Sequence, residues 1–156
     1  MKIKPGVLAV SIAIPLAAGT IAGLASAGSM DAFEALTKPP LSPPGWLFPV
    51  VWSILYVMMG IASYLVFTSG ADRKSIKTAL TVYGVQLFFN FAWTFLFFNF
   101  ELYGLAFVWL LVLWILITFN IALFSQINKT AAYLMVPYLI WVTFAAYLNL
   151  AIALLN

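Results

Sequence analysis

The sequence predicts an all-α integral membrane protein, a bundle of five transmembrane helices formed by a single domain over residues 1–156. Hydrophobic residues make up 65% of the chain and charged residues 7%, whereas a soluble domain has about 25% charged residues. So few polar side chains cannot cover a globule in water. The apolar residues also fall into five stretches, each long enough for the roughly 20 helical residues that cross a bilayer. The lipid bilayer is therefore the expected surroundings.

The first stretch, near residues 6–27, begins after Lys2 and Lys4 and ends in Ala25-Ser-Ala27, so it imitates a secretory signal with an A-x-A cleavage site. Its apolar part is long for the core of a signal peptide, and we expect it to be retained as the first helix. It also contains Gly19-Thr-Ile-Ala-Gly23, a GxxxG pattern that lets another helix approach closely. We expect packing within the chain, with a homodimer contact as the alternative.

Residues 28–45 form the one long connection. Proline lacks an amide hydrogen and fixes its own φ, so the pairs Pro39-Pro40 and Pro43-Pro44 favour stiff, extended backbone. Before them, residues 31–36 are expected to form one short helical turn. A long connection in so compact a protein is usually functional or disordered, and this much proline favours function. We therefore expect residues 28–45 to form a structured cover, called the lid below.

Four further helices are expected near residues 46–68, 78–99, 103–125 and 131–155. They are separated by a polar loop at 69–77, a short turn at Glu101 and a loop at 126–130. Six basic residues lie on the N-terminal side of these helices, and only Lys38 lies on the other side. The six are Lys2, Lys4, Arg73, Lys74, Lys77 and Lys129. The positive-inside rule then places the N-terminus inside and the C-terminus outside, if the membrane is the plasma membrane.

Several chemistries lack their usual residues. The chain has no histidine and no cysteine, and its four acidic residues all lie in the expected loops. We therefore expect no metal site and no required cofactor, and a haem would lack its usual strong axial ligands. The absence of carboxylates from the spans argues against a proton-coupled pump. The basic excess reflects membrane topology, so no nucleic-acid partner is expected.

Polar and aromatic residues inside the spans form ordered faces. The third helix carries one such face, with spacings of 3, 4, 3 and 4: Tyr83, Gln86, Asn90, Trp93 and Phe97. An amide in hydrocarbon needs a partner, so Gln86 and Asn90 should face the bundle interior or a cavity. Hydrogen bonding between helices as structural glue is the more ordinary alternative.

Two other helices carry matching faces. The second has Trp52, Tyr56 and Gly60 at i, i+4 and i+8, and the fifth has Tyr138, Trp141, Ala145 and Asn149. The fourth adds Trp109, Trp114 and Asn120. Any one of these aromatics is ordinarily a packing residue or an interfacial anchor. Together they are typical of a pocket for a flat, largely apolar ligand with a few polar edges.

Three segments carry a resemblance to a known family: Lys38-Pro-Pro with PVVWSILYVMMG at 49–60, QLFFNFAW at 86–93, and PYLIWVTFAAYLN at 137–149. With them the chain resembles, over essentially its whole length, the TspO/MBR family. That family includes the tryptophan-rich sensory proteins of bacteria and the mitochondrial translocator protein, or peripheral benzodiazepine receptor. The resemblance implies a five-helix bundle, often dimeric, with a ligand pocket under the first long connection.

The resemblance also implies ligands and site residues. Family members bind porphyrins such as protoporphyrin IX, and several bind cholesterol and benzodiazepine-site drugs. Matching pocket positions are Trp52, Asn90, Trp93, Trp141 and Ala145, with Tyr56, Gln86 and Tyr138 as neighbours. Light-driven porphyrin breakdown is implied for the bacterial branch, with Trp52 and Trp141 as the redox-active side chains and the porphyrin as ligand or substrate.

One departure from the family bears on the ligand. The mitochondrial branch ends its fifth helix in a cholesterol-recognition pattern that closes on a basic residue. Here residues 148–156 read LNLAIALLN and contain no Lys, Arg or aromatic residue. Such motifs are weak even when present, and this absence favours a tetrapyrrole over a sterol. The alternatives are a transporter of porphyrins or other lipophilic molecules, and a ligand-responsive sensor or scaffold.

Overall fold

The structure is a computed structural model that describes residues 2–156. Its helices, in chain order, are α1 (Pro5–Ser26), η1 (Ala27–Ser29), α2 (Met30–Glu34), α3 (Leu47–Phe67), α4 (Arg73–Thr94), η2 (Phe95–Asn99), α5 (Tyr103–Ile127) and α6 (Lys129–Leu155). Within the described residues there are 5 helical stretches long and apolar enough to cross a membrane, because α1 continues into α2 and α4 into η2. The predicted all-α membrane fold is confirmed.

The third span begins earlier than residue 78, where the sequence placed it. The Asp72 carboxylate accepts a hydrogen bond of 2.9 Å from the Ser75 backbone N–H and so caps α4, which begins at Arg73. Hydrogen bonding from the Ser75 side chain, and next from the Ser75 backbone N–H, lowers the pKa of the exposed Asp72 carboxyl. The polar stretch at 73–77 is therefore helix rather than loop. Asn128 likewise caps α6 by accepting from the Ala131 N–H at 3.0 Å.

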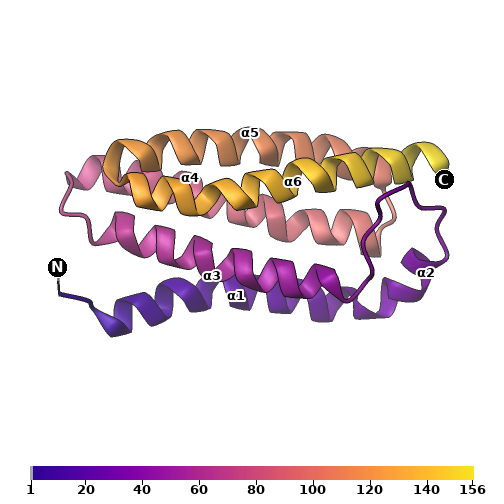
Figure 1. Ribbon diagram of the computed structural model, residues 1–156, viewed down its shortest axis with the longest axis horizontal. Coiled ribbons are helices and arrows are strands. Elements are labelled where there is room, and N and C mark those ends of the chain that lie inside the picture. The colour runs from indigo at the N-terminus through magenta and orange to yellow at the C-terminus, as the bar shows by residue number, and fades with distance from the viewer. Residues whose placement is uncertain (1) are drawn as a thin grey trace.

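The helices form a bundle with two different ends (Figure 1). Around it, α1 packs on α3, α3 on α6, α6 on α5 and α5 on α4. The N-terminus and the short connections at 68–72 and 128 lie at one end, called the basic end because it carries six of the seven Lys/Arg residues. The lid, the turn at 100–102 and the C-terminus lie at the other, called the lid end. This arrangement agrees with an odd number of spans.

Two glycines let α1 and α3 approach closely. A Cβ atom at Gly60 would lie 2.5 Å from the Ile12 Cα, so the two backbones touch there. A Cβ at Gly19 would overlap the ring of Tyr56. The GxxxG pattern therefore packs within the chain at Gly19, as expected. At Gly23, by contrast, a Cβ would meet nothing within 4 Å.

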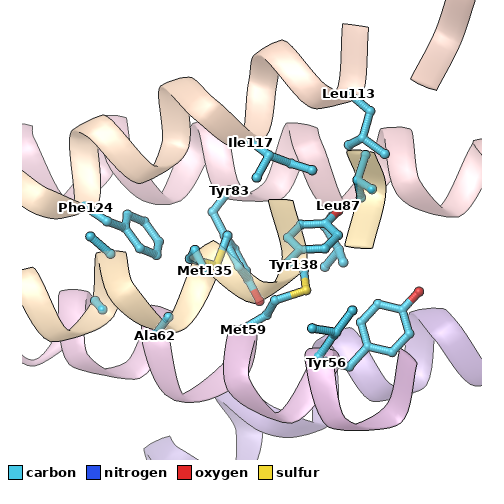
Figure 2. Packing of buried hydrophobic residues seen from close by; sticks show 14 of the residues in the cluster. Tyr56, Met59, Ala62, Tyr83, Leu87, Leu113, Ile117, Phe124, Met135 and Tyr138 are labelled. Carbon is cyan, nitrogen blue, oxygen red and sulfur yellow. The ribbon is translucent and has the colours of Figure 1, made fainter. Parts of the chain in front are cut away.

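The interior toward the basic end is solid. Side chains from α3, α4, α5 and α6 meet there, and Figure 2 shows them interdigitating. Several are fully buried, namely Met59, Ala62, Ile117, Phe124 and Met135. A second, smaller cluster around Phe97, Ala106 and Ile152 lies near the lid. The space between these two clusters is where the candidate site lies.

Candidate functional site

A cavity of about 500 Å³ lies beneath the lid. That volume is within the range of roughly 300–1,000 Å³ found for sites that take drug-sized ligands. Its walls come from α1, the lid, α3, the end of α4 with η2, and α6. The lining includes Gly19, Gly23, Phe33, Lys38, Phe48, Trp52, Tyr56, Trp93, Phe97, Trp141, Ala145 and Asn149. The surface they present is aromatic and aliphatic, with few polar groups.

Five of the eight predicted ligand-binding residues lie on this wall: Trp52, Tyr56, Trp93, Trp141 and Ala145. Helical spacing explains why they converge. On α3, residues 48, 52 and 56 share one face, and on α6, residues 141, 145 and 149 share another. The two faces meet across the cavity because α3 and α6 are packed together. The ligand-binding role of these residues stays a prediction.

Trp52 and Trp141 form an aromatic corner. Their ring centroids are 6.5 Å apart and the rings are nearly perpendicular, at 88°. Trp52 also stacks on Tyr56 at 5.5 Å, and Phe48 lies edge-on to Trp141 at 5.9 Å. Edge-to-face pairs of this kind hold each ring in one orientation. The buried Nε1 of Trp141 has no hydrogen-bond partner among residues 2–156. Buried polar atoms in native proteins nearly always have one, so this N–H is a free donor beside the cavity.

A chain of hydrogen bonds leads from the cavity wall into the bundle. The Tyr56 hydroxyl donates to Asn90 Oδ1 at 3.0 Å, and Asn90 Nδ2 donates to the Tyr138 hydroxyl at 2.8 Å. The Tyr138 hydroxyl in turn donates to Gln86 Oε1 at 2.8 Å. Four side chains from α3, α4 and α6 are thereby joined. Hydrogen bonding between helices, the ordinary alternative for these amides, describes this arrangement.

The three remaining predicted residues, Gln86, Asn90 and Tyr138, therefore lie behind the cavity wall and not on it. They are 0%, 3% and 0% exposed, and their polar atoms are mostly engaged with one another. The helical spacing identified the inward face of α4 correctly. The spacing does not predict which residues of that face border the cavity and which lie in the packed interior beyond it. These three residues reach the cavity wall through the hydrogen bond to Tyr56 and through the ring of Tyr138, which lies edge-on to Trp52 with centroids 6.1 Å apart.

A second polar contact fixes the wall nearer the lid. Trp93 Nε1 donates to Asn149 Oδ1 at 3.0 Å, and Asn149 Nδ2 donates to the Tyr103 carbonyl at 2.8 Å. The ring of Trp93 stacks on Phe97 at 5.2 Å. The Trp93 indole is thus held by a hydrogen bond to α6 and by stacking on η2, which continues its own helix. Its orientation in the cavity is set before any ligand arrives.

The π-helical turn η2 joins α4 to the lid. Its widened backbone is closed by the Phe100 N–H, which bonds the Phe95 carbonyl at 2.9 Å. Both Phe97 and Phe98 then face Phe33 of α2, with ring centroids 6.0 Å and 5.3 Å away. Turns of this type occur frequently at functional sites. Here the turn supplies the aromatic seat on which the lid rests.

The lid is a structured cover, as its prolines predicted. Asn156 holds Thr37 by two hydrogen bonds, of 3.1 Å from the Thr37 N–H and 3.0 Å to its carbonyl. The Tyr147 hydroxyl donates to the Pro40 carbonyl at 2.9 Å. Lys38 is the one basic residue among those lining the cavity, and its Nζ donates to the Glu34 carbonyl at 3.0 Å.

The other tryptophans noted in the sequence do not join the cavity. Trp109 stacks on Phe89 at 4.3 Å and donates to the Phe89 carbonyl, so it anchors α5 to α4. Trp114 donates to the Thr143 hydroxyl on α6. Ordinary packing therefore describes both residues.

Sequence reasoning missed part of the lining. The GxxxG pattern predicts only a helix-packing role for Gly23, yet this glycine borders the cavity. Phe33 had no signal beyond its place in an expected helical turn. The sequence marks Lys38 only as part of a motif and as the one basic residue on its side of the membrane, with no sign that it borders a cavity. Among residues 2–156 there is no group of three or more His, Cys, Asp or Glu side chains that could hold a metal ion.

Comparison with known proteins identifies the family. The TspO/MBR family matches residues 11–155. A "Tryptophan-rich protein TspO" of Chlorobaculum tepidum is 39% identical over 124 residues, covering 80% of this chain and 78% of the relative. Another of that name from Archaeoglobus fulgidus is 35% identical over 152 residues, covering 96% of each. A "Translocator protein" of Ovis aries is 39% identical over 118 residues, or 75% of this chain and 70% of the relative.

The family match covers residues 11–155, which is nearly the whole chain. The relatives come from bacteria, archaea and a mammal, so the likeness is not confined to one lineage. The five apolar spans agree with a multi-pass integral membrane protein. This chain belongs to the TspO/MBR family.

Proposed function

We propose that this protein binds a flat tetrapyrrole such as protoporphyrin IX beneath its lid and promotes the light-driven oxidation of that porphyrin. The observation that supports this is the corner of Trp52 and Trp141 on the wall of a 500 Å³ aromatic cavity. A macrocycle is a large apolar disc, and stacking on such walls is how aromatic side chains hold one. Drugs of the benzodiazepine type are proposed to occupy the same cavity.

The lid would supply the polar end of the site. Protoporphyrin carries two propionate carboxylates, and Lys38 is the cation that borders the cavity. Among residues 2–156 its ammonium group donates to one backbone carbonyl, that of Glu34, and it lies 4.9 Å from the Phe33 ring centroid. It can turn to a carboxylate without breaking an ion pair to an acidic side chain. Binding in this form requires no cofactor and no metal.

The proposed reaction uses light, the porphyrin and dioxygen. The excited macrocycle takes one electron from a neighbouring indole, and the resulting porphyrin radical anion adds dioxygen. The electron returns to the indole radical cation as one carbon–carbon double bond of the macrocycle breaks and two carbonyl bonds form. The net change is porphyrin plus dioxygen to a ring-opened dicarbonyl product, with the indole restored. Trp52 and Trp141 are half-buried and line the cavity, and this position would keep the transfer distance short.

Titration and illumination test this proposal. The purified protein is titrated in the dark with protoporphyrin IX, following tryptophan quenching and porphyrin absorbance, and the saturated sample is then illuminated in air. The test variant is Trp52→Phe/Trp141→Phe. The matched control is Trp109→Phe/Trp114→Phe, which removes the same number of indoles from outside the cavity.

We expect saturable dark binding, and a product spectrum on illumination that the control variant keeps and the test variant loses. Identical products from wild type and both variants would reject the role of the two tryptophans in the reaction. An absence of saturable binding to the wild type would reject the tetrapyrrole site itself. Illumination under argon should abolish the product in the wild type and the control variant, because dioxygen supplies both carbonyl oxygens.

Transport is the second candidate, and the name "Translocator protein" of several relatives is what favours it. The packing toward the basic end speaks against passage through the bundle, because Met59, Phe124 and Met135 fill the interior there. Transport predicts light-independent movement of porphyrin across sealed vesicles that contain the protein. Binding without reaction or movement would instead favour a ligand-responsive sensor or scaffold.

The setting in the membrane is part of the proposal. We propose the plasma membrane, with the basic end inside and the lid outside, from the distribution of Lys and Arg. A homodimer is proposed from the family resemblance. Accessibility labelling of cysteines introduced at positions 2 and 40 in intact cells would test the orientation. Mass photometry of the detergent-purified protein would test the dimer.

A further inference from the structure

A second hollow lies at the basic end, far from the lid. It has a volume of about 630 Å³ and is lined by Phe67 from the end of α3 and by five residues of α4: Arg73, Ile76, Lys77, Leu80 and Thr81. The α4 residues recur at i, i+3, i+4, i+7 and i+8, so they share one face of that helix. From Arg73 to Thr81 this face extends about 12 Å along the helix axis. The hollow is therefore a groove that runs from the end of the bundle toward the membrane interior.

The groove is divided lengthwise by polarity. Arg73, Lys77 and Thr81 form one edge, and Ile76 and Leu80 form the other. The Thr81 hydroxyl is satisfied within its own helix by the Lys77 carbonyl at 2.7 Å. Leu80 packs against the core, which anchors the apolar edge, and Phe67 is 54% exposed opposite it. A ligand that matches this division has an anionic head and a long apolar tail.

Few acidic residues lie near Arg73 and Lys77, the two cations at the mouth of the groove. Asp31, Glu34 and Glu101 lie at the lid end, so Asp72 is the one acidic residue at the basic end. Its Oδ2 accepts the Ser75 N–H and so caps α4. Like charges four residues apart on a helix repel each other, and Arg73 and Lys77 stand in this relation. A bound anion would relieve that repulsion.

We propose that this groove binds one anionic phospholipid from the leaflet at the basic end. Its phosphate lies between Arg73 and Lys77, and one acyl chain lies along Ile76, Leu80 and Phe67. A free phosphate ion would use only the cationic edge and leave the apolar edge without a partner. Basic pockets beside transmembrane helices are known to recognise lipid headgroups. This site is separate from the cavity beneath the lid and does not depend on what that cavity binds.

Native mass spectrometry of the delipidated protein in detergent tests the proposal. Phosphatidylglycerol and phosphatidylcholine with identical acyl chains are titrated separately, and the affinity of the first bound lipid is measured. Two cations at a lipid surface correspond to an about thirtyfold preference for the anionic lipid in the wild type. Arg73→Gln/Lys77→Gln should lose that preference.

Three further measurements separate a built groove from a diffuse basic surface. Lys2→Gln/Lys4→Gln removes two charges from the same end outside the groove and should keep the preference. Thr81→Trp keeps both cations but fills the groove, and should lose the tight first lipid. Inorganic phosphate at millimolar concentration should not displace phosphatidylglycerol.

Each opposite result overturns the proposal. An unchanged preference in Arg73→Gln/Lys77→Gln would reject the two cations as the headgroup site. Equal losses in the two double variants would show that only the total charge of the basic end matters. Wild-type binding by Thr81→Trp would reject the acyl-chain groove, and displacement by phosphate would indicate a plain anion site.

Discussion

The lid half and the basic half of this bundle are built from the same helices but are packed in opposite ways. In the basic half, α1 and α3 touch backbone to backbone at Gly60 and Ile12, and the interior is filled by residues such as Met135 and Phe124. In the lid half, the same two helices border a cavity of about 500 Å³, and a Cβ added at Gly23 would meet nothing. The interior of the bundle is filled at the basic end and hollow at the lid end, and the groove along α4 lies on the surface.

The difference shows where the hollow half gets its rigidity. Lipid tails are as apolar as the helix surfaces, so close packing and hydrogen bonds hold helices together in a membrane. The solid half supplies that packing. The side-chain hydrogen bonds that link Tyr56, Asn90, Tyr138 and Gln86 supply the rest at the boundary between the halves. A cavity can then persist at the lid end without collapse, because its walls are fixed from below.

The largest expected loss of stability comes from a substitution that disrupts packing in the solid half. In Gly60→Ala the new methyl group would lie 2.5 Å from the Ile12 Cα and 2.7 Å from the Ser11 carbonyl oxygen, which are backbone atoms of α1. The two helices must separate, and we expect a loss of about 2 kcal/mol in the free energy of unfolding. The measurement is reversible unfolding in mixed micelles with increasing SDS.

Gly23→Ala is the matched control, on the opposite side of the comparison. It adds the same methyl group in the hollow half, and alanine favours helix over glycine by up to about 1 kcal/mol. We expect unchanged or slightly higher stability. Equal destabilisation by the two substitutions would contradict the division of the bundle into a solid and a hollow half.

A smaller effect sharpens the boundary between the halves. The Tyr138 hydroxyl accepts from Asn90 and donates to Gln86, so Tyr138→Phe leaves two buried amides each short of a partner. Hydrogen bonds between membrane helices contribute about 0.6 kcal/mol on average and at most about 1.7. We expect a loss of about 1.5 kcal/mol by the same unfolding measurement, since two bonds are removed.

Tyr83→Phe is the control, because the Tyr83 hydroxyl is equally buried and has no hydrogen-bond partner in the described part of the chain. Removing it should leave stability unchanged or raise it. If Tyr83→Phe destabilised the protein as much as Tyr138→Phe, the hydrogen bonds that link Tyr56 to Gln86 would not be what stabilises the boundary.

Periodicity and composition predicted the five spans and the inward faces, because apolar length and helical spacing are local properties. They also predicted that Trp52 and Trp141 would share a wall. They could not predict that Gln86 and Asn90 lie behind it, since depth along a face depends on how far neighbouring helices splay. The capping of α4 by Asp72 was missed for another reason: a charged stretch resembles a loop until its cap is noticed.

The smallest expected change in stability, and the one nearest to function, concerns the lid. In Tyr147→Phe the hydrogen bond to the Pro40 carbonyl is lost at an exposed site, so stability should fall by no more than about 0.5 kcal/mol. The lid then opens more often, and we expect the proposed porphyrin to dissociate about twofold faster, the factor that corresponds to 0.5 kcal/mol. Stopped-flow displacement of the bound porphyrin measures this rate.

Tyr133→Phe is the same substitution at the other end of α6, where Tyr133 is 72% exposed, and should leave dissociation unchanged. A dissociation rate that rose equally in both variants, or in neither, would show that the Tyr147 contact does not hold the lid over the cavity. A rate that rose in Tyr147→Phe alone would show that ligand exchange passes through the lid, so that the hollow half is closed from above by a contact far weaker than those that fix it from below.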